Sequence, residues 1–465
     1  MIGLEIHCQL TGLESKLFCP CKADYRGLKP NTNICPVCAG LPGSLPRLNR
    51  QAVIWAAKIA LALGCNIPDR IAFFRKNYFY PDLPKNFQIT QTTLYGDVCA
   101  GTDGAVTTAG KKIRIRRVQL EEDPGRIVYS GSSERTQTTL VDYNRAGTPL
   151  VEIVTEPDFE DPRQAREFLV ILADILENLR ISDPGLEGAV RADGNVSVSG
   201  GNRVEVKNVN SFHDLEKALR YETTRQQSLL ERGIPVVQET RHWDDRRRIT
   251  ISARVKEEET DYRYHLESDI PWVMIPDATQ ERLRESIPES IASRRERYVT
   301  EYGIAEQVAS VLSSDRYFSD LFDGARNTAN TREAANIITT DLMGLLDTRE
   351  KRRSSKLTPA LLGSLADAVV SSKLTRNLAK ISLAEMVKTG EDLDTISSRL
   401  GLDDSPVLDI NSIIESVIQE NPKAMKEART NPQVINYLVG MTMKKTGGKA
   451  DPGLVSKRLR ERAGI

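Results

Sequence analysis

The sequence has no excess of charge of either sign and no long apolar run. Its 465 residues include 64 Lys and Arg and 64 Asp and Glu, so the formal net charge is zero. This excludes a generic nucleic-acid-binding protein of high pI, and any polyanion must bind to a local basic patch. No run of about 18 apolar residues occurs, so no membrane-spanning segment is predicted. Glu5 interrupts the first apolar segment, so we expect no signal peptide and predict a cytoplasmic protein.

The common nucleotide-binding motifs are also missing. There is no G-x-x-x-x-G-K-[ST] loop and no G-x-G-x-x-G after a predicted strand. If the protein uses ATP, it therefore does so without a P-loop. The candidate phosphate ligands are Lys76 and Lys85, which flank three aromatic residues in segment 75–85. The alternative is an aromatic core strand with lysines at its ends.

The length and the 40% hydrophobic content suffice for a large core and for about two to four domains. Strand and turn patterns dominate before residue 275, and helical patterns dominate after it. These patterns predict an α+β fold, with a mixed α/β domain over residues 1–275 and a helical domain over 276–348. A second helical domain, a mobile tail over 357–465, is expected behind the charged linker at 349–356.

Four of the seven cysteines form two short pairs. Cys19 and Cys21 are separated by one residue, and Cys35 and Cys38 by two, on either side of a loop rich in Gly, Pro and Asn. Two such pairs predict a tetrahedral structural zinc site. The alternatives are four reduced structural thiols or a redox pair.

Several predicted strands carry acids among apolar residues. Glu5 and His7 alternate with apolar residues and would point the same way, ~7 Å apart. Glu152 lies in a buried strand, where a carboxylate needs a cation or a hydrogen-bonding partner. Residues 121–123 are three adjacent acids before a turn. The pattern favours a divalent-metal site. The alternatives are a half-exposed strand, a structural pair of Glu152 with Arg145, and a solvated turn.

Two later strands show the same mixture of charge and apolar residues. Asp193 and Asn195 fall on one face of the first strand, and Glu205 accompanies Lys207 in the second. No one of these features is specific by itself.

Taken together, the motifs resemble the family of B subunits of the glutamyl/aspartyl-tRNA amidotransferase. The matching segments occur in the family's order and cover the first 275 residues densely: 3–7, 35–43, 75–85, 120–123, 142–157, 191–198, 205–211, 239–241 and 261–264. The helical part matches more loosely, through 401–402 and 443–452.

The resemblance implies ATP-dependent amidation of Asp or Glu misacylated on tRNA(Asn) or tRNA(Gln). The side-chain carboxylate would be phosphorylated in a cradle-shaped N-terminal domain, and ammonia would then displace the phosphate. The implied partners are misacylated tRNA, a glutaminase (the A subunit) and a small C subunit, with no membrane. The chain has no plausible glutaminase of its own, since residues 354–356 (Ser-Ser-Lys) lie in a charged linker.

The resemblance also implies roles for single residues. The catalytic residues, which would bind magnesium, are Glu5, His7, Glu122 and Glu152. The nucleotide site would include Lys76, Lys85, Asp193 and Asn195. The zinc ligands would be Cys19, Cys21, Cys35 and Cys38.

The C-terminal segment 443–465 is basic, with seven cations against two acids. We expect it to contact the tRNA backbone through Lys444, Lys445, Lys449, Lys457 and Arg458. The alternative is a solvated helical face. Two other functions stay open for the whole chain. One is a free-standing metal-dependent hydrolase, and the other is a zinc-stabilised tRNA-binding module without catalysis.

Overall fold

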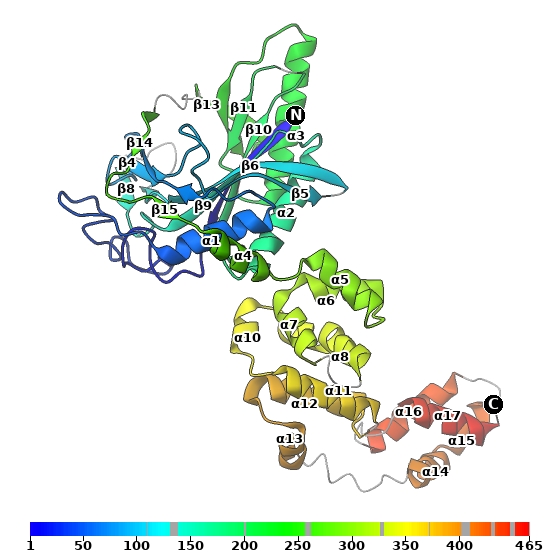
Figure 1. Cartoon of the computed structure of the whole chain (residues 1–465). Helices are drawn as coiled ribbons and strands as arrows, with labels where there is room; N and C mark the ends of the chain where they lie inside the picture. Colours follow the sequence, from blue (N-terminus) through cyan, green and yellow to red (C-terminus); the bar gives the residue numbers. More distant parts are fainter. Residues whose placement is uncertain are drawn as a thin grey trace. The chain divides into compact units, whose positions relative to one another are not determined.

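The computed structural model describes residues 1–108, 110–130, 138–199, 201–255, 262–325, 330–371, 373–400, 410–428, 433–446 and 452–464. The chain forms two compact units, Met1–Ser290 and Ile291–Ile465 (Figure 1). The first unit combines sheets and helices and the second is helical, so the prediction of an α+β fold is confirmed. Within the described part of the chain, every helix is too short or too polar to cross a membrane.

An eight-stranded sheet forms the centre of the first unit. The strand order is β13-β12-β11-β10-β1-β9-β6-β5, and all neighbours are antiparallel except the parallel pair β11 and β12. The strands are β1 (Ile2–Gln9), β5 (Gly101–Thr108), β6 (Lys111–Glu122), β9 (Pro149–Thr155), β10 (Val190–Val196), β11 (Val204–Lys207), β12 (Glu239–Asp244) and β13 (Ile249–Val255).

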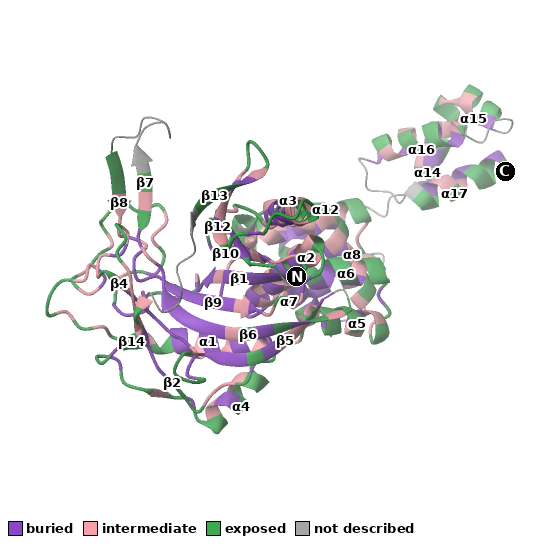
Figure 2. Cartoon of the chain, turned by 90° about the horizontal axis from the view of Figure 1, so that it is seen from above, coloured by how far each residue is buried: buried purple, intermediate pink, exposed green. Residues whose placement is uncertain are grey.

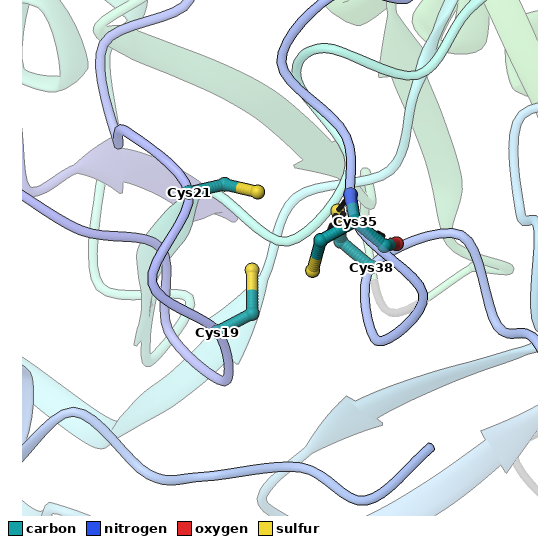
Figure 3. Close-up of side chains that lie close together, drawn as sticks. All are labelled: Cys19, Cys21, Cys35 and Cys38. Carbon is teal, nitrogen blue, oxygen red and sulfur yellow. Dashed lines mark hydrogen bonds between the residues drawn. The ribbon is translucent and has the colours of Figure 1, made fainter. Parts of the chain in front are cut away.

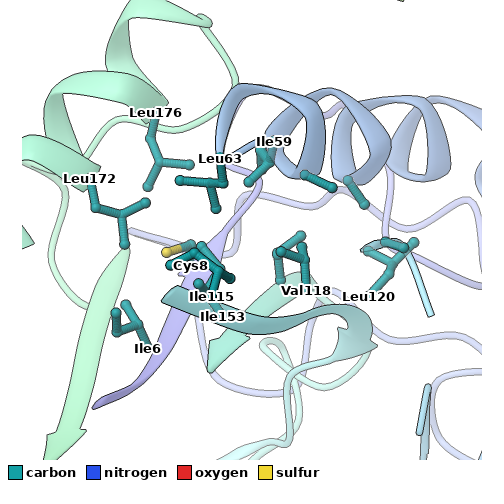
Figure 4. Packing of buried hydrophobic residues seen from close by; sticks show 14 of the residues in the cluster. Ile6, Cys8, Ile59, Leu63, Ile115, Val118, Leu120, Ile153, Leu172 and Leu176 are labelled. Carbon is teal, nitrogen blue, oxygen red and sulfur yellow. The ribbon is translucent and has the colours of Figure 1, made fainter. Parts of the chain in front are cut away.

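The two faces of this sheet differ because alternate side chains point to opposite sides of a strand. One face is apolar and packs against α1 (Arg50–Ala62), α2 (Pro162–Asn178) and α3 (Phe212–Glu231). Figure 4 shows part of this core: Ile6, Cys8, Ile59, Leu63, Ile115, Val118, Leu120, Ile153, Leu172 and Leu176. Full burial of one such aliphatic side chain contributes roughly 1.5–3 kcal/mol. The other face is polar.

Local sequence determines where the covering helices begin. Asn49 accepts hydrogen bonds from the backbone N–H groups of Gln51 and Ala52 at the start of α1. Asp161 and Gln164 form a capping box at the start of α2. Each cap satisfies N–H groups that have no partner inside the helix, which typically stabilises the helix by ~1 kcal/mol.

The described part of the first unit also contains three smaller sheets, in the orders β14-β3-β4, β15-β2 and β7-β8. In Figure 2 the largely exposed strand β8 is green, whereas β1 and β9 of the large sheet are mostly purple, that is, buried. The bounds are β2 (Arg70–Ile71), β3 (Phe74–Asn77), β4 (Phe87–Thr90), β7 (Arg126–Ser130), β8 (Thr138–Asp142), β14 (His265–Leu266) and β15 (Val273–Met274).

The compact units divide at residue 290, one helix later than the change of pattern at 275. The intervening helix α4 (Asp277–Glu285) belongs to the first unit, because Leu283 and Ile287 pack against its core. The predicted domain limits rest on the change from strand to helix patterns, and such patterns do not show which core a helix packs against.

The described residues of the second unit form two hydrophobic clusters, one within residues 298–396 and one within 414–463. Leu357 and Leu362, expected at the start of the tail, share the first cluster with Tyr298 and Phe318. The helices are α5 (Ile291–Thr300), α6 (Glu306–Ser314), α7 (Arg316–Ala325), α8 (Thr331–Ile337), the π-helix η2 (Ile338–Leu342), α9 (Met343–Leu345), α10 (Arg349–Ser354), α11 (Pro359–Val370), α12 (Arg376–Thr389), α13 (Leu393–Leu400), α14 (Ile410–Glu420), α15 (Pro422–Ala428), α16 (Val434–Lys445) and α17 (Pro452–Ala463).

Candidate active site

The polar face of the large sheet brings together acids and a histidine that are far apart in the sequence. β1 pairs with β9, which places His7 opposite Glu152, and with β10, which places Glu5 opposite Asp193. β9 also pairs with β6, which carries Glu121 to a position diagonal to Glu152. Opposite and diagonal side chains on neighbouring strands lie within reach of one another.

His7 lies at the centre of this carboxylate cluster. Its Nε2 atom is 3.7 Å from Glu5 Oε1, 3.6 Å from Glu152 Oε2 and 3.9 Å from Glu121 Oε1. Two sets of three potential ligand atoms, each set within 4.8 Å, share this histidine: one with Glu121 and Glu152, the other with Glu5 and Asp193. Imidazole and carboxylate ligands at these separations suit a divalent cation such as magnesium, manganese or zinc.

Glu122, the fourth residue of the expected metal-binding set, lies away from His7. Its carboxylate pairs with Lys85 and accepts a hydrogen bond from the backbone N–H of Ile89 at 2.8 Å. Consecutive residues of a strand point to opposite faces, so only one of the two adjacent glutamates can face the cluster. In this structure the carboxylate beside His7 is that of Glu121, whereas that of Glu122 is paired with Lys85.

The charges of the cluster shift its pKa values in opposite directions. Burial acts to lower the pKa of His7, but the hydrogen bond with Glu152 and the charges of Glu5, Glu152 and Glu121 raise it to about 9. Burial and the charge of Glu152 raise the pKa of Glu121 to about 7 and also raise that of Glu5. Burial acts to raise the pKa of Glu152, but the hydrogen bond with His7 and the charges of His7 and Arg117 lower it below its usual value. Opposed shifts among neighbouring groups are typical of functional sites.

A cavity of about 350 Å³ opens over this cluster. Glu5, Glu121 and Glu152 contribute acidic groups to its lining. Its cationic lining residues are Lys76, Arg116, Arg117, Arg203 and Lys207. The cavity therefore offers ligands for a divalent cation and positive charge for an anion such as phosphate in the same place.

The two lysines expected at the nucleotide have different positions. Lys76 lines the cavity, and its ammonium lies 4.6 Å from the centre of the Tyr262 ring. Burial acts to lower the pKa of Lys76, but nearby tyrosine and glutamate groups raise it above its usual value. Lys85 is instead bound to Glu122, and both side chains are largely buried. Of these two lysines, Lys76 lines the cavity and Lys85 does not.

The expected residues of β10 also separate into two environments. Asn195 lines the cavity, and its buried Oδ1 atom has no hydrogen-bond partner among the described residues. This oxygen can accept a hydrogen bond from a ligand. Asp193 pairs with Lys207 at 2.8 Å, and the same ammonium lies 3.5 Å from Glu205. Asp193 therefore orients a cavity lysine as well as lying beside Glu5.

Arg117 is a cavity residue that the sequence did not single out. Its guanidinium donates to Gln119 at 2.9 Å and to Glu152 at 3.4 Å. The pairing of β6 with β9 is irregular between Ile115 and Arg117. Such an irregularity changes which side chains face each way. The only signal in the sequence was the run of arginines in segment 114–117.

The alternative of a structural pair between Glu152 and Arg145 is not what the structure contains. Arg145 donates to the backbone carbonyls of Pro124 at 2.9 Å and Gly125 at 2.7 Å, and so stabilises a turn. The arginine that meets Glu152 is Arg117, which lines the cavity.

The four cysteines of the expected zinc site point toward a common space (Figure 3). All four Sγ atoms lie within 4.8 Å of one another, and those of Cys35 and Cys38 are 3.8 Å apart. A tetrahedral zinc with bonds of ~2.3 Å places its sulfurs about 3.8 Å apart. The donor set therefore fits a closed zinc site. The remaining cysteines, Cys8, Cys65 and Cys99, are buried and free.

The basic residues expected to contact tRNA lie in or near the last two helices. Lys444 and Lys457 are exposed. Lys445 instead pairs with Glu420, and Arg458 donates to the side chain of Asn411. Lys449 lies outside the described residues. The expected set therefore contains cations open to a ligand and cations already engaged within their own cluster.

A polar cavity with converging acids, a histidine and cations, carried by an α/β scaffold, defines this chain as part of an enzyme. Residues 1–281 match the family model described as the GatB/GatE catalytic domain, and residues 320–462 match the GatB domain. The chain belongs to the family of aspartyl/glutamyl-tRNA(Asn/Gln) amidotransferase B subunits.

Relatives from several organisms share this similarity over their full length. A protein of Sulfolobus acidocaldarius is 45% identical over 471 residues, which cover 100% of this chain and 99% of the relative. A protein of Sulfurisphaera tokodaii is 43% identical over 472 residues with the same coverage. One from Caldanaerobacter subterraneus is 40% identical over 477 residues, covering 99% and 98%. Each is named as the B subunit of aspartyl/glutamyl-tRNA(Asn/Gln) amidotransferase, a name that implies an enzyme of several subunits.

Proposed function

We propose that this chain activates the side-chain carboxylate of Asp or Glu misacylated on tRNA(Asn) or tRNA(Gln), using ATP, so that ammonia can convert it to the amide. The names of the relatives support the amidation and its tRNA substrates. The observation that carries the phosphorylation is the joint presence of the acid–histidine cluster and five cations in one cavity. This cavity lies within the segment that matches the catalytic domain.

The chemistry needs positioning and charge neutralisation more than a protein nucleophile. One oxygen of the substrate carboxylate attacks the γ-phosphorus of ATP, and ADP leaves with the electron pair of the broken P–O bond. Ammonia then attacks the activated carbonyl carbon and loses a proton, and phosphate leaves. Because the first nucleophile is already an anion, no strong base is required in the cavity.

Separate groups of this chain would serve the nucleotide and its metal ion. Glu5, His7, Glu121 and Glu152 would hold magnesium, which would supply positive charge to offset the negative charge of the phosphates. Lys76, Arg117 and Lys207 would neutralise the transferred phosphate, and Asn195 would accept a hydrogen bond from the nucleotide. Two of these three cations are held by acids, since Arg117 pairs with Glu152 and Lys207 with Asp193. Their side chains are therefore oriented before a ligand enters.

The proposed activity also needs a source of ammonia and a surface that binds tRNA. A partner glutaminase, the A subunit of the enzyme, would supply the ammonia, and a small C subunit would complete a heterotrimer. The four cysteines would hold a structural zinc. Lys444 and Lys457, which are exposed, would contact the tRNA backbone.

The test is to measure ADP formation by the purified complex in the presence of misacylated or correctly acylated tRNA. We expect ADP to form only with misacylated tRNA, and with ammonium salts as well as with glutamine. Glu152→Gln should lower this ADP formation by about 100-fold or more, since it removes a metal ligand. Glutamine hydrolysis by the partner should persist. Glu160→Gln, at a side chain that is 78% exposed, is the matched control and should behave as wild type.

Two results would contradict the proposal. ATP consumption that is the same with and without misacylated tRNA would indicate a free-standing metal-dependent hydrolase. Amidation that is unchanged by Glu152→Gln would indicate a tRNA-binding role without catalysis at this cavity.

A further inference from the structure

Lys16 is among the largest fully buried side chains of the protein, with 0% of its surface exposed. It lies three residues before Cys19, and its backbone N–H donates to the carbonyl of Cys21 at 2.8 Å. Gly147 and Cys38 pack close to its aliphatic stem: a Cβ atom placed on Gly147 would lie 3.5 Å from both Lys16 Cδ and Cys38 Cβ. The position of this lysine is therefore fixed by the loop that carries the cysteines.

The ammonium of Lys16 has an unusual set of neighbours for a buried cation. Nζ donates to the backbone carbonyl of Asn33 at 2.9 Å and to Cys38 Sγ at 3.6 Å. Among the described residues, no carboxylate lies within ion-pair distance of it, although a buried lysine normally has an acidic partner. The carboxylate of Glu122 borders the same pocket, since the Cβ placed on Gly147 would lie 3.9 Å from its Oε2 atom, but it is paired with Lys85. Cys38 Sγ is therefore the group that accepts a hydrogen bond from Lys16 and can carry negative charge.

Cys38 Sγ accepts hydrogen bonds that would stabilise a negative charge on it. It accepts a hydrogen bond from the backbone N–H of Cys35 at 3.2 Å in addition to the one from Lys16. Thiols must lose their protons to bind a metal, and donors directed at the sulfur stabilise the resulting thiolate. A zinc ion with four thiolates has a net charge of minus two, so a buried ammonium beside it reduces the net charge of the group to minus one.

We propose that Lys16 is a positioning residue of the four-cysteine metal centre, where its ammonium compensates thiolate charge and its N–H···S hydrogen bond holds Cys38. The inference rests on the proposed zinc. When zinc is bound, the ammonium and the thiolates stabilise one another. When zinc is removed, the same ammonium stays buried, with the Asn33 carbonyl and Cys38 Sγ as its hydrogen-bond partners among the described residues and no carboxylate within ion-pair distance. Lys16 therefore makes the fold of the loop depend on the metal more strongly than four cysteines alone would.

This coupling predicts that the loss of Lys16 weakens zinc binding but does not destabilise the zinc-free protein. Lys16→Met should lower the zinc affinity of the full-length chain by about 10-fold or more, as is usual for a group that supports metal ligands. In protein stripped of zinc, Lys16→Met should unfold at a temperature equal to or higher than wild type, because the uncompensated charge is gone. The loss of Tm on chelation should thus be smaller for the variant than for wild type.

The experiment is a zinc competition titration against a colorimetric chelator, paired with thermal unfolding of loaded and stripped protein. Lys22→Met is the matched control. Lys22 is an exposed lysine of the same loop, so this variant removes the same charge at the surface. Lys16→Arg, which keeps the charge, should retain most of the affinity. In cobalt-substituted protein it should shift the thiolate-to-cobalt charge-transfer band, because the donor to Cys38 changes. A role in packing alone would not move that band.

The outcomes separate the two proposals. A wild-type chain that neither contains nor binds zinc overturns the zinc site and the inference together. Zinc binding that is equal in wild type, Lys16→Met and Lys22→Met overturns the role of Lys16 alone. If Lys16→Met does not fold with zinc present, Lys16→Arg decides: an affinity loss of 10-fold or an unshifted cobalt band overturns the inference.

Discussion

At the scale of single residues, two adjacent glutamates have different environments. Glu121 lines the cavity beside His7 and accepts a hydrogen bond from the Thr90 hydroxyl at 2.8 Å. Glu122 is buried against Lys85. A carboxylate with like charges beside it can be neutralised without loss of stability, whereas removal of the partner of a buried lysine leaves that charge uncompensated.

The variants Glu121→Gln and Glu122→Gln should therefore fail in different ways. Glu121→Gln should lower manganese affinity and tRNA-dependent ADP formation by about 100-fold or more, with little change in Tm. Glu122→Gln should lower the free energy of unfolding by roughly 1–3 kcal/mol and leave manganese affinity within a few-fold of wild type. Metal titration and thermal unfolding of both variants provide the measurement. The reverse pattern would show that Glu122 is the metal ligand.

At the scale of elements, the small sheet β14-β3-β4 holds Lys76 at the cavity. Arg75, the preceding residue of β3, donates two hydrogen bonds to Glu267, at 2.7 and 2.8 Å, next to the end of β14. The carboxylate of Glu267 is almost fully buried. Alternation in β3 sends Lys76 to the face opposite this pair. The ion pair therefore joins two strands that are far apart in the sequence and orients a lysine that it does not touch.

Glu267→Gln should weaken this connection in a pH-dependent way. Burial opposes the hydrogen bonds from Arg75, but they lower the pKa of Glu267 below its unfolded value. The stabilisation is thus present above the unfolded pKa of ~4.3 and is lost as pH falls through the folded pKa. We expect the variant to be roughly 1–3 kcal/mol less stable than wild type at pH 7. Denaturant unfolding at pH 7 and pH 3 should show the difference shrinking toward zero, and a constant difference would refute the ion-pair explanation.

At the scale of the whole molecule, the helical half divides between two hydrophobic clusters rather than at the charged segment 349–356. Residues 357–396 complete the cluster that begins at Tyr298, whereas residues 414–463 form a separate one. A truncation at 357 would expose the first cluster to water, and a truncation after 400 would leave it whole. The helices of the second cluster, α16 and α17, carry four of the basic residues expected to contact tRNA: Lys444, Lys445, Lys457 and Arg458.

Removal of residues 401–465 should therefore weaken tRNA binding without unfolding the rest. We expect the KM for misacylated tRNA to rise several-fold. The magnitude of the salt slope of binding should fall by about one for each phosphate that the truncated protein no longer neutralises. Measurement of tRNA affinity over a range of salt concentrations tests both. Lys444→Gln with Lys457→Gln should reproduce part of the effect, while Lys445→Gln should chiefly affect stability because Lys445 is paired with Glu420. Unchanged affinity and slope would assign tRNA binding to other helices.

The sequence by itself determined the features that depend on residue type and local spacing. The Cys19–Cys21 and Cys35–Cys38 pairs, the alternation of Glu5 and His7, and the change from strand to helix patterns near 275 are all properties of neighbouring residues. Local geometry translates such patterns directly into faces and elements. The order of motifs also sufficed for the family.

Only the tertiary structure decided which of these residues meet. A strand's alternation separates Glu121 from Glu122 but does not say which face looks into the cavity, because that depends on how β6 pairs with β9. The same irregular pairing brings Arg117 to Glu152. The buried contacts of Lys85 with Glu122 and of Lys16 with Cys38 join residues 22 or more positions apart. Their partners are selected by packing and by the requirement that a buried charge be compensated, neither of which is visible in local sequence.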